Sequence, residues 1–213
     1  MVSRDINGCL ENAIKMGIGL VYYTDNQCDE RITNAVRARL SEIGYPIVSV
    51  SHRPLPGFGK NIVVEMGRGI LTMYKQILIG LEASESDIIF LTEHDVLYDP
   101  THFKFIPPEK DVFYYNVNTW VINAETGTGM THSQKQTSGL CAYRDLLVEH
   151  YRRRVERAKR EGPLSHMGGF EPGISFYPKG VDNHRAESWI SECPNIDIRH
   201  TNNLTLGRFM ELL

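Results

Sequence analysis

Two carboxylates spaced two residues apart follow a short apolar run near the middle of the chain. The run covers residues 88–91, and Thr92, Glu93, His94 and Asp95 come directly after it. In an extended chain Glu93 and Asp95 point to one side and His94 to the other. Two converging carboxylates repel each other unless a cation lies between them, and Mg²⁺ and Mn²⁺ favour carboxylate and phosphate oxygens. The segment therefore predicts a divalent metal site, with a solvated turn carrying two surface acids as the alternative.

The elements that position these acids are indicated by the hydrophobic spacing. Continuous apolar runs at 17–23, 47–50 and 88–91 predict buried strands, and apolar residues at helical spacing over 32–43 and 70–81 predict helices between them. This β-α-β-α-β order implies a right-handed parallel sheet covered by helices, with ligands beyond the carboxyl ends of the strands. We expect an α/β fold class, a single Rossmann-like domain with a mostly parallel central sheet flanked by helices.

The second half of the sequence has a different order of predicted strands and helices. Apolar patterns predict strands at 112–117, 119–123 and 140–143, followed by a long amphipathic helix over 144–160. The first two strands are too close together for a helical crossover. Residues 161–185 are rich in Gly and Pro and are expected to form an ordered loop, whereas the tail after residue 187 has no clear pattern.

Composition excludes several classes of protein. The 213 residues carry a net charge of −3 and are 41% hydrophobic, which excludes collagen, coiled coil, wholesale disorder and a generic polyanion binder. The four cysteines lack CxxC spacing, which favours free thiols in a reducing compartment. The sequence shows neither a secretory signal nor an apolar stretch of about 20 residues. We expect a cytoplasmic protein without a transmembrane segment.

Polar side chains follow the other predicted strands as well. A first group, Thr24, Asp25 and Asn26, comes directly after the first strand, where an ordinary turn or helix cap is the alternative. A second group lies in or after the Gly- and Pro-rich loop that follows the second strand, and consists of Arg53, Lys60, Asn61 and Arg68. The cations of the second group suit a diphosphate, and the neighbouring glycines allow a close approach of backbone to ligand. A plain surface loop is the alternative.

The sequence resembles the nucleotide-sugar-dependent glycosyltransferases of the GT-A fold, in particular small bacterial and phage-type members. The resemblance covers the organisation of residues 17–143, the acidic motif in DIIFLTEHDVLYDP and the ending NIDIRHTNNLT. In this family a D-x-D-type motif ends a strand near mid-domain, and here Glu93 replaces the commoner first Asp. The resemblance implies residues 18–95 as a nucleotide-sugar-binding half and residues 96–213 as an acceptor-side half with the C-terminal tail, within one domain spanning 1–213.

The resemblance also implies roles for individual residues. Glu93 and Asp95 are expected to bind Mn²⁺ or Mg²⁺, which bridges the donor diphosphate, and His200 is expected to be a third ligand. The group after the first strand is expected to contact base and ribose, and a UDP-sugar is the expected donor. The acceptor, whether glycan, small molecule or modified DNA, is not specified by any pattern.

An inverting transfer also requires a general base for the acceptor hydroxyl. Glu171, on a turn rich in Gly and Pro, is the first candidate, and Asp182 and Glu187 are its rivals. A retaining transfer needs no such base, in which case the metal acts as the Lewis acid.

Three other functions remain open at this stage. A nucleotidyltransferase shares the β-α-β site and the carboxylate chemistry, although it usually has a Gly-rich segment where TDNQCDE stands here. The basic stretch RRRVERAKR at 152–160 is consistent with a non-catalytic nucleic-acid-binding relic of the fold, or with a glycosyltransferase that modifies a DNA base. A solvated helix face, with Arg152 and Glu156 paired, is the plain alternative.

Overall fold

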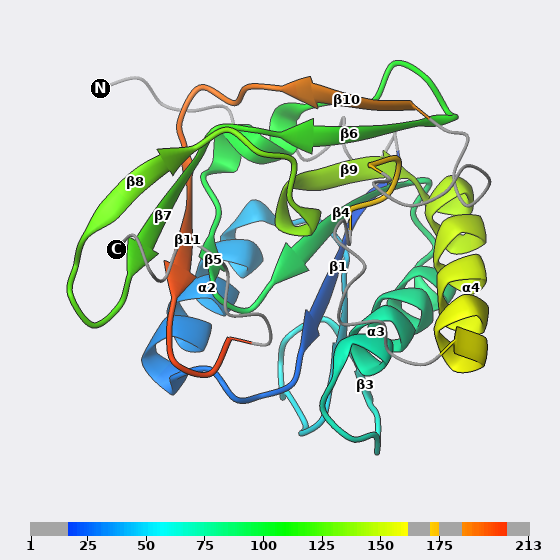
Figure 1. Cartoon of the computed structure of the whole chain (residues 1–213), viewed down its shortest axis with the longest axis horizontal. Helices are drawn as coiled ribbons and strands as arrows, with labels where there is room; N and C mark the ends of the chain where they lie inside the picture. The colour runs from blue at the N-terminus through cyan, green and yellow to red at the C-terminus, as the bar shows by residue number, and fades with distance from the viewer. Residues whose placement is uncertain (1–16, 162–170, 175–184, 204–213) are drawn as a thin grey trace.

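A mixed β-sheet forms the centre of the structure (Figure 1). The computed structural model describes residues 17–161, 171–174 and 185–203, and within these residues the sheet has seven strands in the order β10-β6-β9-β4-β1-β2-β3. The predicted α/β class with a mostly parallel central sheet is confirmed, because only β9 runs against its neighbours in this sheet.

The predicted β-α-β-α-β order is confirmed in the first half of the chain. Strands β2, β1 and β4 lie side by side and parallel, as expected from their continuous apolar runs. The elements are β1 (Ile18–Thr24), α2 (Glu30–Ile43), β2 (Ile47–Ser51), α3 (Ile70–Ala83) and β4 (Ile88–Glu93). An additional strand, β3 (Lys60–Val63), pairs in parallel with β2 inside the segment that the sequence predicted to be a loop.

The second half of the chain adds strands to the central sheet and also forms a second sheet. The central sheet gains β6 (Val112–Asn116), β9 (Leu140–Tyr143) and β10 (Arg185–Trp189). A second, four-stranded sheet has the order β5-β11-β7-β8. Its strands are β5 (Val96–Leu97), β7 (Thr119–Asn123), β8 (Gly129–His132) and β11 (Asn195–Arg199). The two neighbouring strands predicted at 112–117 and 119–123 are therefore real, but they belong to different sheets.

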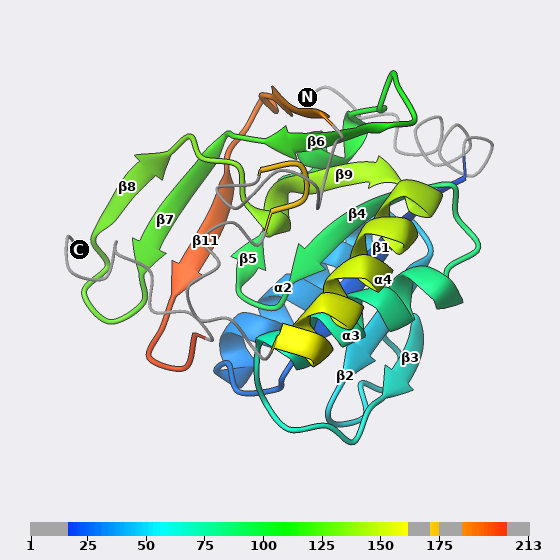
Figure 2. The same ribbon diagram turned by 45° about the vertical axis from the view of Figure 1, so that its right-hand side comes forward.

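The second sheet brings the end of the chain to the acidic segment. Strand β11 pairs antiparallel with β5, so that Asp197 lies opposite Val96, one residue after Asp95. Figure 2 shows β11 and β7 standing beside the end of the central sheet where β4 passes into β5. The residues that follow β11 are thereby delivered to the carboxyl end of β4.

Helices cover both faces of the central sheet. Helices α3 and α4 (Arg144–Glu161) pack side by side on one face, where Val21 and Tyr23 of β1 are buried against them (Figure 2). Helix α2 packs on the other face against Leu20 and Tyr22. This alternation along β1 follows from the period of two in a strand. All seven residues of β1 are buried, which explains its uninterrupted apolar pattern.

The basic helix α4 has its arginines paired with acidic side chains. Arg152 lies 2.7 Å from Glu82 of α3, so the predicted pairing with Glu156 is wrong. Arg153 pairs with Glu149 at 3.0 Å and Arg157 pairs with Glu161 at 2.7 Å. These pairs offset much of the positive charge, as expected for a solvated helix face. Among the described residues, every helix is too short or too polar to cross a lipid bilayer.

Candidate active-site cavity

A cavity of about 150 Å³ opens at the carboxyl ends of β1 and β4. This is the edge at which open α/β sheets bind their ligands. Its walls come from the ends of both strands, from the start of α3, from residues 136–138 and from β11. The polar lining residues are Thr24, Asp25, His52, Arg68, Thr72, Gln76, Glu93, His94, Asp95, Gln136, Thr137, Ser138, Glu171, Asp197, Arg199 and Asn203.

The two acids of the central motif occupy different electrostatic environments. Burial, together with the nearby charge of Asp95, raises the pKa of Glu93 well above its usual range, and the Tyr23 hydroxyl donates a hydrogen bond to Glu93 Oε1. Burial alone would also raise the pKa of Asp95, but His94, His200 and Arg199 outweigh it, and the pKa of Asp95 lies below its usual value. Asp95 is therefore the ionised carboxylate and the better cation ligand of the two.

The extended-chain argument predicted that His94 points away from the two acids. In the structure it does not. The chain makes a turn at His94 and Asp95 before it continues into β5. Consequently all three residues of the motif line the cavity, and His94 Nε2 lies 3.9 Å from Asp95 Oδ2. Strand alternation ends where the strand ends, which is why the prediction failed for His94.

The structure brings His200, the predicted third ligand, next to Asp95. Its Nε2 atom lies 3.6 Å from Asp95 Oδ2, and the side chain is only 7% exposed. This Nε2 atom is buried and has no hydrogen-bond partner among the described residues. Asn203 accepts a hydrogen bond from the His200 amide at 2.7 Å and donates one to Asp95 Oδ2 at 2.6 Å. The C-terminal turn thus holds an imidazole and a carboxylate together.

A buried ion pair on β11 forms another wall. Arg199 Nη2 lies 2.6 Å from Asp197 Oδ2, and Gln136 Nε2 donates to the same oxygen at 3.4 Å. Burial would lower the pKa of Arg199, but Asp197, Asp95 and Glu93 raise it, so this guanidinium is charged. The sequence analysis missed this pair, although the spacing of two residues in NIDIR places both side chains on one face of a strand.

Two residues of the first polar group and one of the second meet at the cavity. Thr24, Asp25 and Arg68 all line it, and Arg68 Nε lies 2.5 Å from Asp25 Oδ2. The second guanidinium nitrogen of Arg68 donates to the backbone carbonyl of Asn202. Arg68 therefore links the end of β1 to the turn that carries His200.

The remaining predicted donor-binding residues lie outside this cavity. Asn26 has a left-handed backbone (φ 57°), and its side-chain oxygen accepts hydrogen bonds from the amides of His52 and Arg53. It joins the two loops that follow β1 and β2, and Arg53 and Asn26 face a separate, open groove. This groove also contains His200, and the predicted contacts of Asn26 with base and ribose and of Arg53 with the diphosphate stay predictions.

Lys60 and Asn61 form hydrogen bonds within the protein in this structure. Lys60 donates to the carbonyl of Ala83 at 3.1 Å, away from the cavity. The Asn61 amide group donates to Ser49 and Ser51, and its oxygen accepts from the Leu55 amide at 3.0 Å. Because these bonds use both ends of the Asn61 side chain, it stabilises the 52–60 loop instead of facing a ligand.

Of the two candidate bases that the structure describes, Glu171 lies at the cavity wall. Its backbone carbonyl accepts from Arg154, and the neighbouring Pro172 carbonyl accepts from the Tyr115 hydroxyl at 2.6 Å. Glu187 lies on β10, where it pairs with Arg185 at 3.1 Å and does not line the cavity. Asp182 lies outside the described residues.

The cavity is acidic overall. Five lining residues carry carboxyl groups, namely Asp25, Glu93, Asp95, Glu171 and Asp197, of which Glu93 has a raised pKa, whereas two, Arg68 and Arg199, carry guanidinium groups. A diphosphate entering such a site requires additional positive charge. Together with the unpartnered His200 Nε2 beside Asp95, this excess of acids fits a divalent cation.

The arrangement of strands and helices is a GT-A-like α/β fold. A glycosyltransferase involved in the glycosylation of the major capsid of PBCV-1 is similar to this chain with a TM-score of 0.52 and 10% identity, over 84% of this chain and 92% of that chain. At this identity the likeness establishes the fold alone.

Two further solved structures are more distant. Glucosyl-3-phosphoglycerate synthase from Mycobacterium tuberculosis, in complex with Mn²⁺, uridine diphosphate and phosphoglyceric acid, has a TM-score of 0.46 and 9% identity, over 100% of this chain and 78% of that chain. The bifunctional IspDF from Campylobacter jejuni has a TM-score of 0.44 and 13% identity; the match covers 63% of this chain and only 42% of that one. No protein-family model and no curated protein sequence matches the chain.

Proposed function

We propose that the protein is a glycosyltransferase that moves a sugar from a nucleoside diphosphate sugar, with UDP as the nucleotide, to a hydroxyl acceptor. The observation that supports this most directly is the ionised Asp95, which lines the acidic cavity at the carboxyl end of β4 and has His200 Nε2 3.6 Å away. In this reading Asp95 and His200 hold Mn²⁺ or Mg²⁺, and Glu93 lies beside them with its hydrogen bond from Tyr23. The cation supplies positive charge that stabilises the diphosphate as it leaves.

The chain's own residues account for the other requirements of the reaction. Thr24, Asp25 and Arg68 line the cavity, and in this proposal Thr24 and Asp25 contact the nucleoside while Arg68 provides a guanidinium for the diphosphate. During transfer the bond between the anomeric carbon and the diphosphate oxygen breaks, and a bond to the acceptor oxygen forms. In an inverting reaction Glu171 receives the proton of the acceptor hydroxyl. The products are the glycoside and the nucleoside diphosphate.

The arginines of α4 give little support to the nucleic-acid-binding alternative. Four of the arginines in this helix form ion pairs with Glu82, Glu149 or Glu161. A surface whose cations are already paired gains less from contact with phosphates. The acceptor is therefore left as a hydroxyl compound of unspecified class.

The test is a calorimetric titration of UDP into the protein with Mn²⁺ and, separately, with EDTA. We expect binding that requires the metal, and we expect Asp95→Asn to weaken it by about 100-fold or more, because loss even of a residue behind a metal ligand typically costs 10–100-fold. Asp111→Asn, an exposed acid far from the motif, is the matched control and should bind like the parent.

Two results would count against the proposal. One is metal-independent or absent binding of UDP, GDP and TDP alike, with the protein folded. The other is release of pyrophosphate from a nucleoside triphosphate, which would indicate a nucleotidyltransferase. Unchanged Mn²⁺-dependent binding in folded Asp95→Asn would remove Asp95 from the site.

A further inference from the structure

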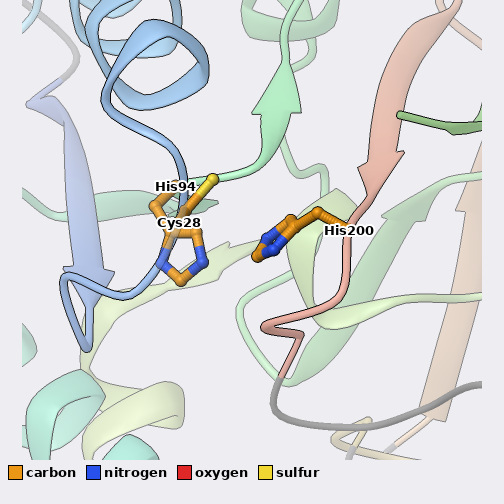
Figure 3. Close-up of side chains that lie close together, drawn as sticks. All are labelled: Cys28, His94 and His200. Carbon is orange, nitrogen blue, oxygen red and sulfur yellow. The ribbon is translucent and has the colours of Figure 1, made fainter. Parts of the chain in front are cut away.

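A thiol lies beside the two histidines of the candidate site. Cys28, His94 and His200 each offer one ligand atom, and these atoms all lie within 4.8 Å of one another. Figure 3 shows the three side chains together, coming from the loop between β1 and α2, the turn between β4 and β5, and the segment after β11. The sequence analysis treated Cys28 as an ordinary free thiol, because no cysteine pair is present.

We propose that Cys28, His94 and His200 form a binding set for a borderline-soft divalent cation of the Zn²⁺ type, with one thiolate and two imidazole ligands. Sulfur and imidazole nitrogen are the ligands that Zn²⁺ and Co²⁺ prefer, whereas Mg²⁺ takes oxygen. The set shares His200 with the proposed donor cation, so the two cations exclude each other at this imidazole, but the proposal does not depend on glycosyl transfer.

The surroundings of the three residues suit such a cation. Cys28 and His200 are 8% and 7% exposed, and His200 Nε2 is buried without a hydrogen-bond partner among the described residues. Asp95 Oδ2 lies 3.6 Å from His200 Nε2 and 3.9 Å from His94 Nε2. A divalent cation bound to one thiolate retains a single positive charge, and the Asp95 carboxylate is placed to offset it.

The geometry needs only small adjustments. Ligand atoms at about 2.0–2.3 Å from a tetrahedral metal lie roughly 3.3–3.8 Å apart, so the three ligand atoms must approach one another by at most about 1–1.5 Å. His200 Nδ1 now accepts from the Asn202 amide at 3.2 Å. Coordination through Nε2 places the ring proton on Nδ1, so Nδ1 no longer accepts this hydrogen bond. The exposed Asn202 amide can then donate to water instead. Binding of the thiolate releases the Cys28 proton to solvent.

The test is a titration of Co²⁺ into metal-stripped, full-length protein, followed by near-ultraviolet absorption, where a thiolate-to-cobalt charge-transfer band reports a bound sulfur. We expect the band to saturate at one equivalent in the parent and in the control Cys193→Ser, and to be lost in Cys28→Ser and Cys28→Ala. His94→Gln should weaken Co²⁺ affinity by about 10-fold or more, and added Zn²⁺ should abolish the band.

The proposal is overturned if the parent shows no band, or if folded Cys28→Ser or Cys28→Ala keeps it. Melting curves without metal establish that each variant is folded. His94→Gln changes a partly exposed turn residue. If both Cys28 variants are unfolded, this variant tests the proposal instead, and an unchanged Co²⁺ affinity refutes the site. UDP titration with Mn²⁺ runs in parallel, so that a cobalt band without UDP binding rejects the glycosyltransferase proposal alone, and the reverse rejects the thiolate site alone.

Discussion

Asn203 donates a hydrogen bond of 2.6 Å to Asp95, a residue 108 positions earlier in the chain. The same side chain accepts a hydrogen bond from the backbone amide of His200. One amide group therefore fixes the carboxylate by its nitrogen and the histidine by its oxygen. The relative position of the two candidate cation ligands depends on a residue that is not itself a ligand.

Replacing Asn203 is therefore expected to weaken metal-dependent nucleotide binding without unfolding the protein. Residues that orient metal ligands typically contribute 10–100-fold to affinity, so Asn203→Ala should raise the Kd for UDP in Mn²⁺ by about 10-fold or more. Asn34→Ala, at an exposed position of α2, is the control. Calorimetry gives the Kd, and an Asn203→Ala value within twofold of the parent would contradict the positioning role.

Arg68 and Lys60 were predicted to serve the same diphosphate, and the structure separates them. Arg68 lines the cavity, whereas Lys60 donates to Ala83 elsewhere. A hydrogen bond to a charged group is worth about 1.5–3 kcal/mol, so Arg68→Gln should weaken UDP binding about 10- to 100-fold. Lys60→Gln, which removes the same charge from the chain, should leave the Kd within twofold. Equal losses in the two variants would point to long-range electrostatics instead of a contact.

Stability should depend on pH through His102. Burial lowers the pKa of His102 to about 3, below the value of 6.5 expected in the unfolded chain. Its Nδ1 accepts hydrogen bonds from Asn116 at 2.9 Å and Asn195 at 3.2 Å, which also favours the neutral ring. The folded state thus binds fewer protons than the unfolded state. The contribution of His102 to the free energy of unfolding is therefore complete above pH 6.5 and is lost as the pH falls toward 3, at up to about 1.4 kcal/mol per pH unit.

Urea unfolding of the parent and of His102→Gln at several pH values between 7.5 and 4 isolates this contribution. Glutamine can still accept from the two asparagines but does not titrate. We expect the free energy of unfolding of the parent to fall more steeply with decreasing pH than that of the variant. Parallel pH profiles would show that His102 binds protons equally in the folded and the unfolded state.

Gly80 allows α3 to approach the central sheet. A Cβ atom at this position would lie 2.5 Å from Cγ1 of Val21, a stiff side chain in β1. Alanine is favoured over glycine in a helix by about 1 kcal/mol, but overpacking a core costs about 1–3 kcal/mol, so Gly80→Ala should lower the melting temperature. Gly67→Ala, which meets no atom within 4 Å, is the control. A higher melting temperature for Gly80→Ala would show that the gain in helix propensity exceeds the cost of overpacking.

The central sheet could be predicted from the sequence because its strands are buried on both faces. Strands β1 and β4 are continuous apolar runs, and the helix between β1 and β2 ends at residue 43, as predicted, with Gly44 in a left-handed backbone conformation directly after it. Strand β3 was missed because it lies at the sheet edge, where its residues are exposed or half-exposed and show no apolar pattern. Local pattern identifies buried elements better than peripheral ones.

The candidate site could be predicted only in part. Asp95 and His200 were named from the acidic motif and the family resemblance, and the structure brings them together. The hydrogen bond from Tyr23 to Glu93 depends on the pairing of β1 with β4, in which these two residues are directly opposite. Cys28, His94 and His200 are separated by 66 and 106 residues, so no motif of fixed spacing could have grouped them. Such clusters arise from topology and not from local sequence.

The site closes through a segment that lies outside the central sheet. Strand β11 belongs to the smaller sheet, and the turn after it contacts Gln27, Arg68 and Asp95, which are 175, 134 and 108 residues away in the chain. Proteins open in cooperative units whose opening free energies can be far below that of global unfolding. We therefore expect residues 195–203 to open at a lower free-energy cost than the central sheet, which would break the site without unfolding the domain. Amide hydrogen exchange should be faster in this segment than in β1 and β4.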